Sequence, residues 1–216
     1  MTLGYDLYWS FRSPYSYLVT QRLVALEADH DVRCTVRVVY PIAVRQADFF
    51  AHVDPLWFSY LLRDVVRCGA YLEIPVRWPV PDPVVMDLVT RTYPAEQPYI
   101  YRLSHLGQIA AERGRGLAFL DAVSRVLWDG SVDRWHEGDH LAHAVASAGL
   151  DLDEMDAVRV AEHGRLDAQI IANQAAQRVG GHYGVPLMVF EGEPFFGQDR
   201  FDQLKWRLTQ HGLTPR

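Results

Sequence analysis

Apolar and polar residues near the N-terminus follow first a strand period and then a helix period. Residues 5–11 are rich in residues that favour β-strands, and residues 32–40 show the alternation of apolar and polar residues typical of a β-strand. Residues 14–29 lie between them and carry apolar side chains at helical spacing. The predicted core face of that helix consists of Tyr17, Leu18, Leu23, Val24 and Leu26. Strand, helix and strand in this spacing predict a βαβ unit with parallel strands and a right-handed crossover.

The C-terminal end returns to the strand pattern. Residues 185–190 form an apolar run, residues 191–193 a tight turn, and Pro194 begins an answering strand that ends at Gly197. Residues 198–211 have the pattern of an amphipathic helix. The predicted order is therefore βαβ, a long middle block, and ββα.

The middle block is helical in pattern. Helices are predicted from 54–55 onward, at 99–112, at 117–128, at 139–148, from a capping box at 151–154, and at 164–178. Residues 74–83 contain four prolines and predict an extended connector. We expect one domain built from residues 1–47 and 182–216, with residues 48–181 as an inserted helical subdomain.

The first strand passes directly into the first helix at Ser13-Pro14. Ser13 suits a helix N-cap, and Pro14 suits the first helical position because its missing N–H costs nothing there. The Ser13 hydroxyl should therefore lie at the positive end of a helix, beside unpaired backbone donors. Local sequence leaves two interpretations of Ser13, a plain cap or a donor to a ligand.

Charge and composition narrow the classes of partner. The chain has 216 residues and a net charge of −6, and it has no Lys- or Arg-rich block that would indicate binding to nucleic acid or to an anionic membrane. No secretory signal and no apolar run of membrane-spanning length is present, so we expect a cytoplasmic protein that does not bind a membrane. Cys34 and Cys68 are the only cysteines and form no Cys-x-x-Cys, so we expect two buried thiols and no disulfide.

One apparent metal motif is better explained by a helix start. Residues 136–140, His-Glu-Gly-Asp-His, match the H-E-x-x-H pattern of zinc proteases, which places both histidines on one helical face. Gly138-Asp139 predicts that the helix begins there, which leaves His136 outside it. We therefore expect no metal site.

Several separated motifs carry a family resemblance. They are Phe-Arg-Ser-Pro-Tyr-Ser-Tyr-Leu at 11–18, Gly-Val-Pro at 184–186, and Glu-Pro-Phe-Phe-Gly-Gln-Asp-Arg at 193–200, supported by 61–64 and 135–141. In this order they resemble the 2-hydroxychromene-2-carboxylate isomerases and their kappa-class glutathione transferase relatives. The resemblance implies an α/β protein with a thioredoxin-like (DsbA-like) fold, a four-stranded sheet with a helical insertion, and a homodimeric state.

The same resemblance implies a glutathione-dependent isomerase acting on 2-hydroxychromene-2-carboxylate or a similar small aromatic substrate. Redox members of the superfamily carry Cys-x-x-Cys where this chain has Ser13 and Ser16. A reactive thiol must then arrive with a ligand, and glutathione is the ligand that the resemblance supplies.

The resemblance also assigns residues to glutathione. Ser13 would stabilise the thiolate, helped by the helix N-terminus. Val185 and Pro186 would form a cis peptide bond, with the Val185 backbone pairing with the cysteinyl part. Gln198 and Asp199 would hold the γ-glutamyl end, although Asp199 also suits a first-turn acid.

Two departures from the family pattern concern charge. Arg12 stands where relatives have an apolar residue, and it either pairs with a carboxylate of the substrate or of glutathione, or is solvated. In relatives the loop after the second strand is rich in glycine and carries an Asn or Lys near glutathione. This chain has residues 41–48, Pro-Ile-Ala-Val-Arg-Gln-Ala-Asp, in its place.

A group of aromatic residues is either core or the wall of a pocket for a flat substrate, namely Trp9, Trp57, Trp78, Phe49 and Phe50.

Two other functions stay open on this sequence. A kappa-like transferase would conjugate glutathione to an electrophile instead of releasing it. A non-catalytic DsbA-like protein would bind another ligand in the same groove. Ser13 and Ser16 argue against a thiol–disulfide oxidoreductase.

Overall fold

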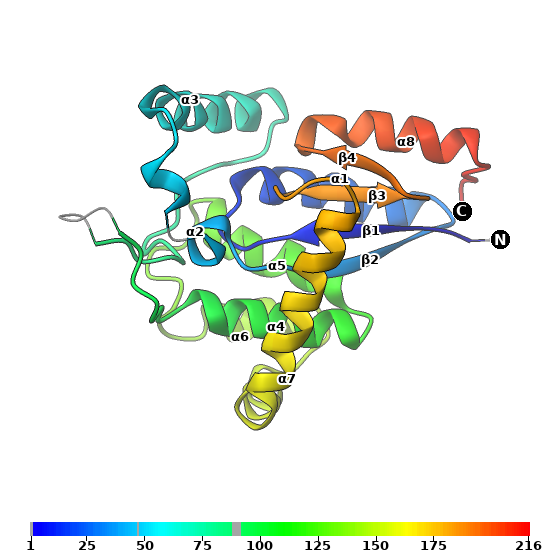
Figure 1. Cartoon of the computed structure of the whole chain (residues 1–216). Helices are drawn as coiled ribbons and strands as arrows, with labels where there is room; N and C mark the ends of the chain where they lie inside the picture. The colour runs from blue at the N-terminus through cyan, green and yellow to red at the C-terminus, as the bar shows by residue number, and fades with distance from the viewer. Residues whose placement is uncertain (1, 47, 88–91) are drawn as a thin grey trace.

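The structure is a computed structural model that describes residues 2–46, 48–87 and 92–216. Its four strands form one mixed sheet in the order β2-β1-β3-β4 (Figure 1). β1 (Leu3–Trp9) pairs in parallel with β2 (Val32–Val38). β1 also pairs antiparallel with β3 (Leu187–Phe190), which forms an antiparallel hairpin with β4 (Glu193–Phe196). The predicted βαβ and ββα units and the α/β fold are therefore confirmed.

The start of helix α1 (Pro14–Asp29) follows the prediction. The Ser13 side chain caps it by accepting a hydrogen bond from the Ser16 amide, and Pro14 is the first helical residue. Tyr17, Leu18, Leu23 and Leu26 are buried, whereas Val24 is half-buried. The fully buried Trp9 of β1 donates its indole N–H to the Ser16 carbonyl and the Thr20 hydroxyl, so its one polar group is satisfied.

The C-terminal helix begins later than the sequence predicts. A short 3-10 turn, η2 (Gln198–Arg200), comes before α8 (Phe201–Gln210). Gly197 has φ +102°, in the region that favours glycine, and its carbonyl accepts from the Arg200 amide. Asp199 therefore lies in the tight turn and not in the first turn of the α-helix.

The middle block is helical as predicted, with one extra short turn, and a short helix α2 (Ile42–Arg45) precedes it. Its elements are η1 (Phe49–Ala51), α3 (Pro55–Tyr71), α4 (Ile100–Glu112), α5 (Gly116–Trp128), α6 (His140–Ser147) and α7 (Leu152–Val179). Residue 47 of the predicted loop 41–48 lies outside the described residues. Residues 74–87 have no regular secondary structure, as their prolines predict.

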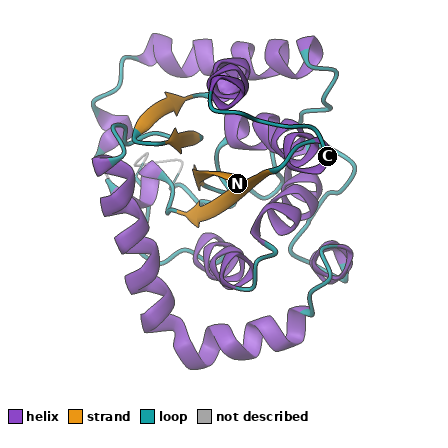
Figure 2. Ribbon diagram, turned by 90° about the vertical axis from the view of Figure 1, so that its right-hand side faces the viewer, coloured by secondary structure: helices purple, strands orange, loops and turns teal. Residues whose placement is uncertain are grey.

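Helix α7 consists of the two helices that the sequence predicts from 151 and from 164. They follow one another without a loop, and non-helical torsions at Glu162, φ −122° and ψ 19°, mark the kink between them. The bend is visible in Figure 2, where the long helix changes direction. Asp151 caps α7 by accepting from the Glu154 amide, but the Glu154 carboxylate bonds Arg113 and does not complete the capping box.

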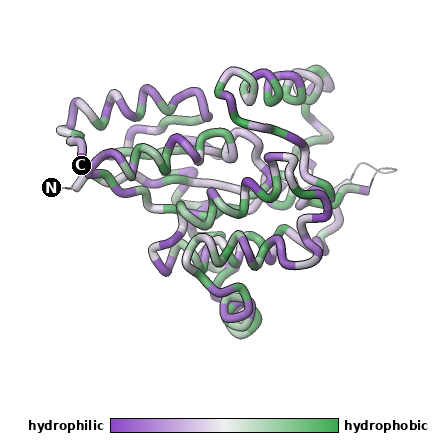
Figure 3. The backbone as a smooth tube through the Cα atoms, turned by 180° about the vertical axis from the view of Figure 1, so that it is seen from behind, coloured by the Kyte–Doolittle hydropathy of each residue, from purple (hydrophilic) through white to green (hydrophobic). Residues whose placement is uncertain are grey.

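Both parts of the chain contribute to one core. Helices α4 and α5 contact β2, and α5 also contacts α1, whereas α8 lies beside β3 and β4 (Figure 1). Gly107 of α4 permits the close approach to the sheet, since a Cβ there would lie 2.9 Å from the Phe11 ring. Hydrophobic and hydrophilic positions alternate along the outer helices, as expected of helices with one face against a core (Figure 3). Among the helices of the described residues, none is both long and apolar enough to cross a membrane.

Candidate functional site

A cavity of about 420 Å³ opens where β1 passes into α1. It lies between this junction, the short helix α2, helix α3 and the loop before β3. Its lining is mostly apolar and aromatic, with polar groups from Ser10, Ser13, Arg12, Arg45 and His182. An apolar cavity with a few convergent polar groups is the usual form of a small-molecule site.

Ser13 is the cap of α1 and also faces the cavity. Its hydroxyl oxygen accepts from the Ser16 amide at 3.1 Å, as a cap, and the hydroxyl donates to the Val185 carbonyl at 3.3 Å. It also lines the cavity. Ser16, the second residue of the Ser-x-x-Ser, is fully buried, and its hydroxyl has no hydrogen-bond partner among the described residues. Only Ser13 of the two can therefore meet a ligand in the cavity.

The loop before β3 lies opposite Ser13. The Val185-Pro186 peptide bond is cis, as the resemblance implies. Val185 lines the cavity, while Pro186 is buried behind it and its carbonyl accepts from the Gly197 amide. No described residue accepts a hydrogen bond from the Val185 amide. One backbone donor beside Ser13 is thus open to a ligand.

Arg12 is neither solvated nor unpaired. Its guanidinium donates twice to Asp82, from Nε to Oδ1 at 2.9 Å and from Nη2 to Oδ2 at 2.9 Å, and its side chain is 14% exposed. Burial alone would lower the Arg12 pKa, but the Asp82 charge and hydrogen bonds outweigh it and the pKa is raised. The sequence predicted a carboxylate of the substrate or of glutathione, or a solvated side chain, whereas the partner in the structure is a carboxylate of the chain itself, 70 residues away.

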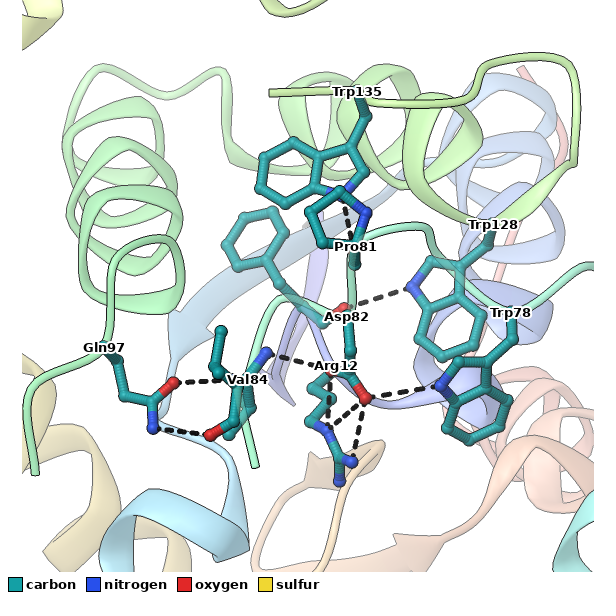
Figure 4. Close-up of polar contacts among 10 residues, drawn as sticks. Arg12, Trp78, Pro81, Asp82, Val84, Gln97, Trp128 and Trp135 are labelled. Atoms are coloured by element: carbon teal, nitrogen blue, oxygen red, sulfur yellow. Dashed lines mark hydrogen bonds and ion pairs between the residues drawn. The ribbon is translucent and has the colours of Figure 1, made fainter. Parts of the chain in front are cut away.

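Asp82 belongs to a set of contacts that holds the proline-rich connector at the cavity (Figure 4). Its carboxylate also accepts from the Trp78 indole at 3.3 Å and from the Val84 amide at 2.9 Å. On either side, the Trp135 indole donates to the Pro81 carbonyl, and the Gln97 amide pairs with the Val85 backbone. Asp82 is therefore held in place by contacts that do not involve Arg12.

Gln198 and Asp199 lie apart from this cavity. Gln198 accepts from Arg22 through its carbonyl and side-chain oxygens, and its Nε2 lies 3.6 Å from the Cys68 sulfur. Asp199 is exposed and pairs with Arg200. Neither lines the cavity, so their assignment to glutathione stays a prediction.

Most of the predicted aromatic wall is present. Phe49, Phe50, Trp57 and Trp78 line the cavity, together with Tyr60 of α3. Trp9 does not, because it is fully buried in the core. The wall gives the cavity flat apolar surfaces, which favour a flat aromatic ligand.

Sequence reasoning missed Arg45 and His182. Arg45 ends α2 and lines the cavity, and burial and the nearby Arg178 lower its pKa to about 10. His182 stacks on Phe196 with ring centroids 3.7 Å apart, its Nδ1 accepts from the Gly184 amide, and burial lowers its pKa. The local sequence holds no signal for either, because each faces the cavity only in the folded chain.

The apparent metal motif has the geometry expected from the helix start. Helix α6 begins at His140, and His136 precedes it. Within residues 2–46, 48–87 and 92–216, no group of three or more His, Cys, Asp or Glu side chains could hold a metal ion. Cys34 and Cys68 are both free, as predicted, but each is half-buried and not fully buried.

The βαβ and ββα units with a helical insertion, and a polar helix N-terminus facing a cis-proline loop, define a thioredoxin-like protein of the DsbA type. Residues 6–209 match the DsbA-like thioredoxin domain, and the chain belongs to that family.

Named relatives support this placement. The chain is 26% identical over 213 residues to the 2-hydroxychromene-2-carboxylate isomerase of Sphingobium xenophagum, which covers 95% of this chain and 97% of that protein. A solved 2-hydroxychromene-2-carboxylate isomerase superposes with a TM-score of 0.69 at 22% identity, covering 96% of this chain and 95% of the other. A cytosolic disulfide reductase, DsbM from Pseudomonas aeruginosa, solved with glutathione, has a TM-score of 0.56 at 17% identity, covering 96% and 100%. The two structures, both under 25% identical, show a shared fold.

Proposed function

We propose that this protein is a glutathione-dependent isomerase of 2-hydroxychromene-2-carboxylate or a similar flat aromatic substrate. The observation that carries the proposal is Ser13, whose hydroxyl lies at the α1 N-terminus inside an aromatic cavity, opposite the cis Val185-Pro186 loop. The Sphingobium xenophagum relative, similar over nearly the whole of both chains, supports an isomerase in this family.

The residues present fit glutathione at three points. Ser13 supplies a hydroxyl donor beside a helix N-terminus, where a thiolate is favoured. The Val185 amide has no partner among the described residues and suits the carbonyl of a bound peptide. The cavity wall carries a cationic side chain, Arg45, and glutathione is an anion.

Bound glutathione supplies a transient nucleophile, whose addition and departure permit rotation about a substrate double bond. The chain's own part is to hold and orient. Ser13 turns its O–H from the Val185 carbonyl, a long 3.3 Å contact, toward the sulfur, and the α1 dipole adds to the stabilisation of negative charge. The aromatic side chains exclude water and hold the flat substrate against Ser13.

Ser13→Ala tests the proposal. Loss of a preorganised donor to developing charge lowers kcat by roughly 100-fold or more, so turnover should fall further than glutathione affinity. A spectrophotometric isomerase assay and calorimetric titration with glutathione measure the two effects. Turnover of Ser13→Ala equal to that of wild type would contradict the proposed role of Ser13.

The matched control is Asp151→Ala, because Ser13 is also a cap. Asp151 caps α7 through the Glu154 amide, and losing either cap costs about 1 kcal/mol of stability. Asp151→Ala should lower the melting temperature to a similar degree and leave turnover unchanged. A similar loss of turnover in both variants would assign the effect to stability.

The other two functions have distinct outcomes. A kappa-like transferase would yield a product heavier than the substrate by one glutathione, which mass spectrometry detects. A protein that binds another ligand would show no rise in melting temperature with millimolar glutathione, because only a ligand of the native state stabilises it.

A further inference from the structure

Among the described residues, two arginines line the cavity, and only one of these two has a counterion. Arg12 is neutralised by Asp82. Arg45 donates from Nη1 to the Gln177 side-chain oxygen at 3.2 Å and from Nη2 to the Tyr183 carbonyl at 3.0 Å. Both acceptors are neutral, and Arg45 forms no ion pair with any carboxylate of the described chain. Arg45 therefore has a positive charge that no described residue of the cavity compensates.

The environment of Arg45 makes that charge costly in the free protein. Burial and the neighbouring Arg178 lower its pKa to about 10, so it remains protonated at neutral pH. Its Nε is buried and has no hydrogen-bond partner among the described residues. A half-buried cation without a counterion costs free energy that an anionic ligand would offset.

The position of Arg45 defines the ligand chemistry. It shares the cavity with Ser13 and with the aromatic side chains of Phe49 and Trp57. A guanidinium offers paired N–H donors that match a carboxylate. The cavity thus suits a flat apolar body that carries a carboxylate.

We propose that Arg45 binds a carboxylate of the ligand held in this cavity, a role that rests on the proposed function for the identity of that ligand. Glutathione and a chromene carboxylate both carry this group, so the shared chemistry is carboxylate recognition. Arg45 also holds the Tyr183 carbonyl, and Gln177, its other partner, donates to the Gly184 carbonyl. The carboxylate site and the loop that carries Val185 are therefore joined through Arg45.

The test compares charged and blocked probes by calorimetric titration with wild type and Arg45→Gln. One pair is glutathione and its glycyl monoethyl ester. The other is coumarin-3-carboxylate and coumarin-3-carboxamide, a flat bicycle with and without the charge. Wild type should prefer at least one carboxylate over its blocked partner by roughly 10- to 100-fold, the size of one charge-assisted hydrogen-bonded contact. Arg45→Gln should lose that preference.

The pair that loses its preference identifies the source of the carboxylate, and either result supports the role of Arg45. Preferences unchanged in Arg45→Gln, or no preference in wild type, would overturn it. If wild type prefers coumarin-3-carboxylate but binds no glutathione and has no isomerase activity, the proposed function fails while the role of Arg45 stands.

Two further variants keep the test independent of folding. Arg45→Lys retains the charge and should keep part of the preference, even if Arg45→Gln folds poorly. Arg33→Gln removes an exposed arginine of β2 that does not line the cavity, and should leave every preference unchanged. Circular dichroism of each variant confirms that it is folded.

Discussion

Arg12 and Arg45 show how neighbours decide the role of one residue type. Both are arginines in the wall of the same cavity. Arg12 pairs with the Asp82 carboxylate, which the Trp78 indole and the Val84 amide also hold by hydrogen bonds. Arg45 meets only neutral oxygens. The first arginine is consequently part of the framework, and the second has a charge without a counterion, which we propose serves a ligand carboxylate.

Asp82→Asn tests the framework role of Arg12. The amide can keep a contact with the Val84 N–H, but it leaves the Arg12 guanidinium without a counterion. Because the pair is mostly buried, we expect a loss of about 1–3 kcal/mol in the free energy of unfolding, measured by urea denaturation.

An exposed ion pair provides the comparison. Asp133 pairs with Arg77 at side-chain exposures of 67% and 44%, so Asp133→Asn should cost about 0–1 kcal/mol. Equal losses in the two variants would contradict the special position of Asp82.

Helix α4 depends on one glycine to reach the sheet. A Cβ on Gly107 would lie 2.9 Å from the Phe11 ring and 3.1 Å from a Val38 methyl group, and both neighbours are fully buried. Gly164, in α7, has nothing within 4 Å of a Cβ and is exposed. The same residue type is thus required in one helix and replaceable in the other.

Gly107→Ala and Gly164→Ala should change stability in opposite directions. The first forces overlap in a packed core, at a cost of about 1–3 kcal/mol that exceeds the helix propensity gained. The second gains up to about 1 kcal/mol from propensity alone. Thermal unfolding of both variants measures the signs, and a more stable Gly107→Ala would show that the α4–sheet contact can relax.

Charge pairs join α4 to α7 across the inserted helices. Arg102 of α4 and Arg159 pair with Asp156, and Arg165 of α7 pairs with Glu112. Burial alone would raise the pKa values of Asp156 and Glu112, but hydrogen bonds from these arginines outweigh it and both values are lowered. The folded protein therefore binds protons at these two groups less readily than the unfolded chain does.

This difference predicts acid sensitivity. A carboxylate with a lowered pKa contributes stability that is fully present above its ordinary pKa, about 4, and is lost as the pH falls through the lowered value. Urea midpoints between pH 7 and pH 3 should fall toward the acid end. Asp156→Asn should lower the midpoint at pH 7 and reduce the dependence on pH, whereas an unchanged dependence would place the acid-sensitive groups elsewhere.

Local features of the chain were predictable from neighbouring residues alone. Ser13 and Pro14 define the start of α1 because a cap and a first-turn proline act on their own backbone. The prolines of 74–83 exclude a helix in the same way, and the apolar positions of β2, at Val32, Val36 and Val38, are the buried ones. The DsbA-like fold and the placing of Ser13 opposite Val185 followed from these features together with the family resemblance. The kink of α7 at Glu162 likewise lies close to Gly164, where the sequence predicts that a new helix begins.

The charges of the site were decided only by the tertiary structure. Whether Arg12 is solvated or paired depends on Asp82, 70 residues away in the connector. Whether Arg45 has a counterion depends on α7 and on the loop before β3, neither of which is near it in sequence. Electrostatic energy depends on the distance between charges in space and on their burial, and neither quantity follows from the order of residues along the chain. The sequence determined that Ser13 caps α1 next to the loop before β3, and folding determined which arginine of the cavity has a counterion.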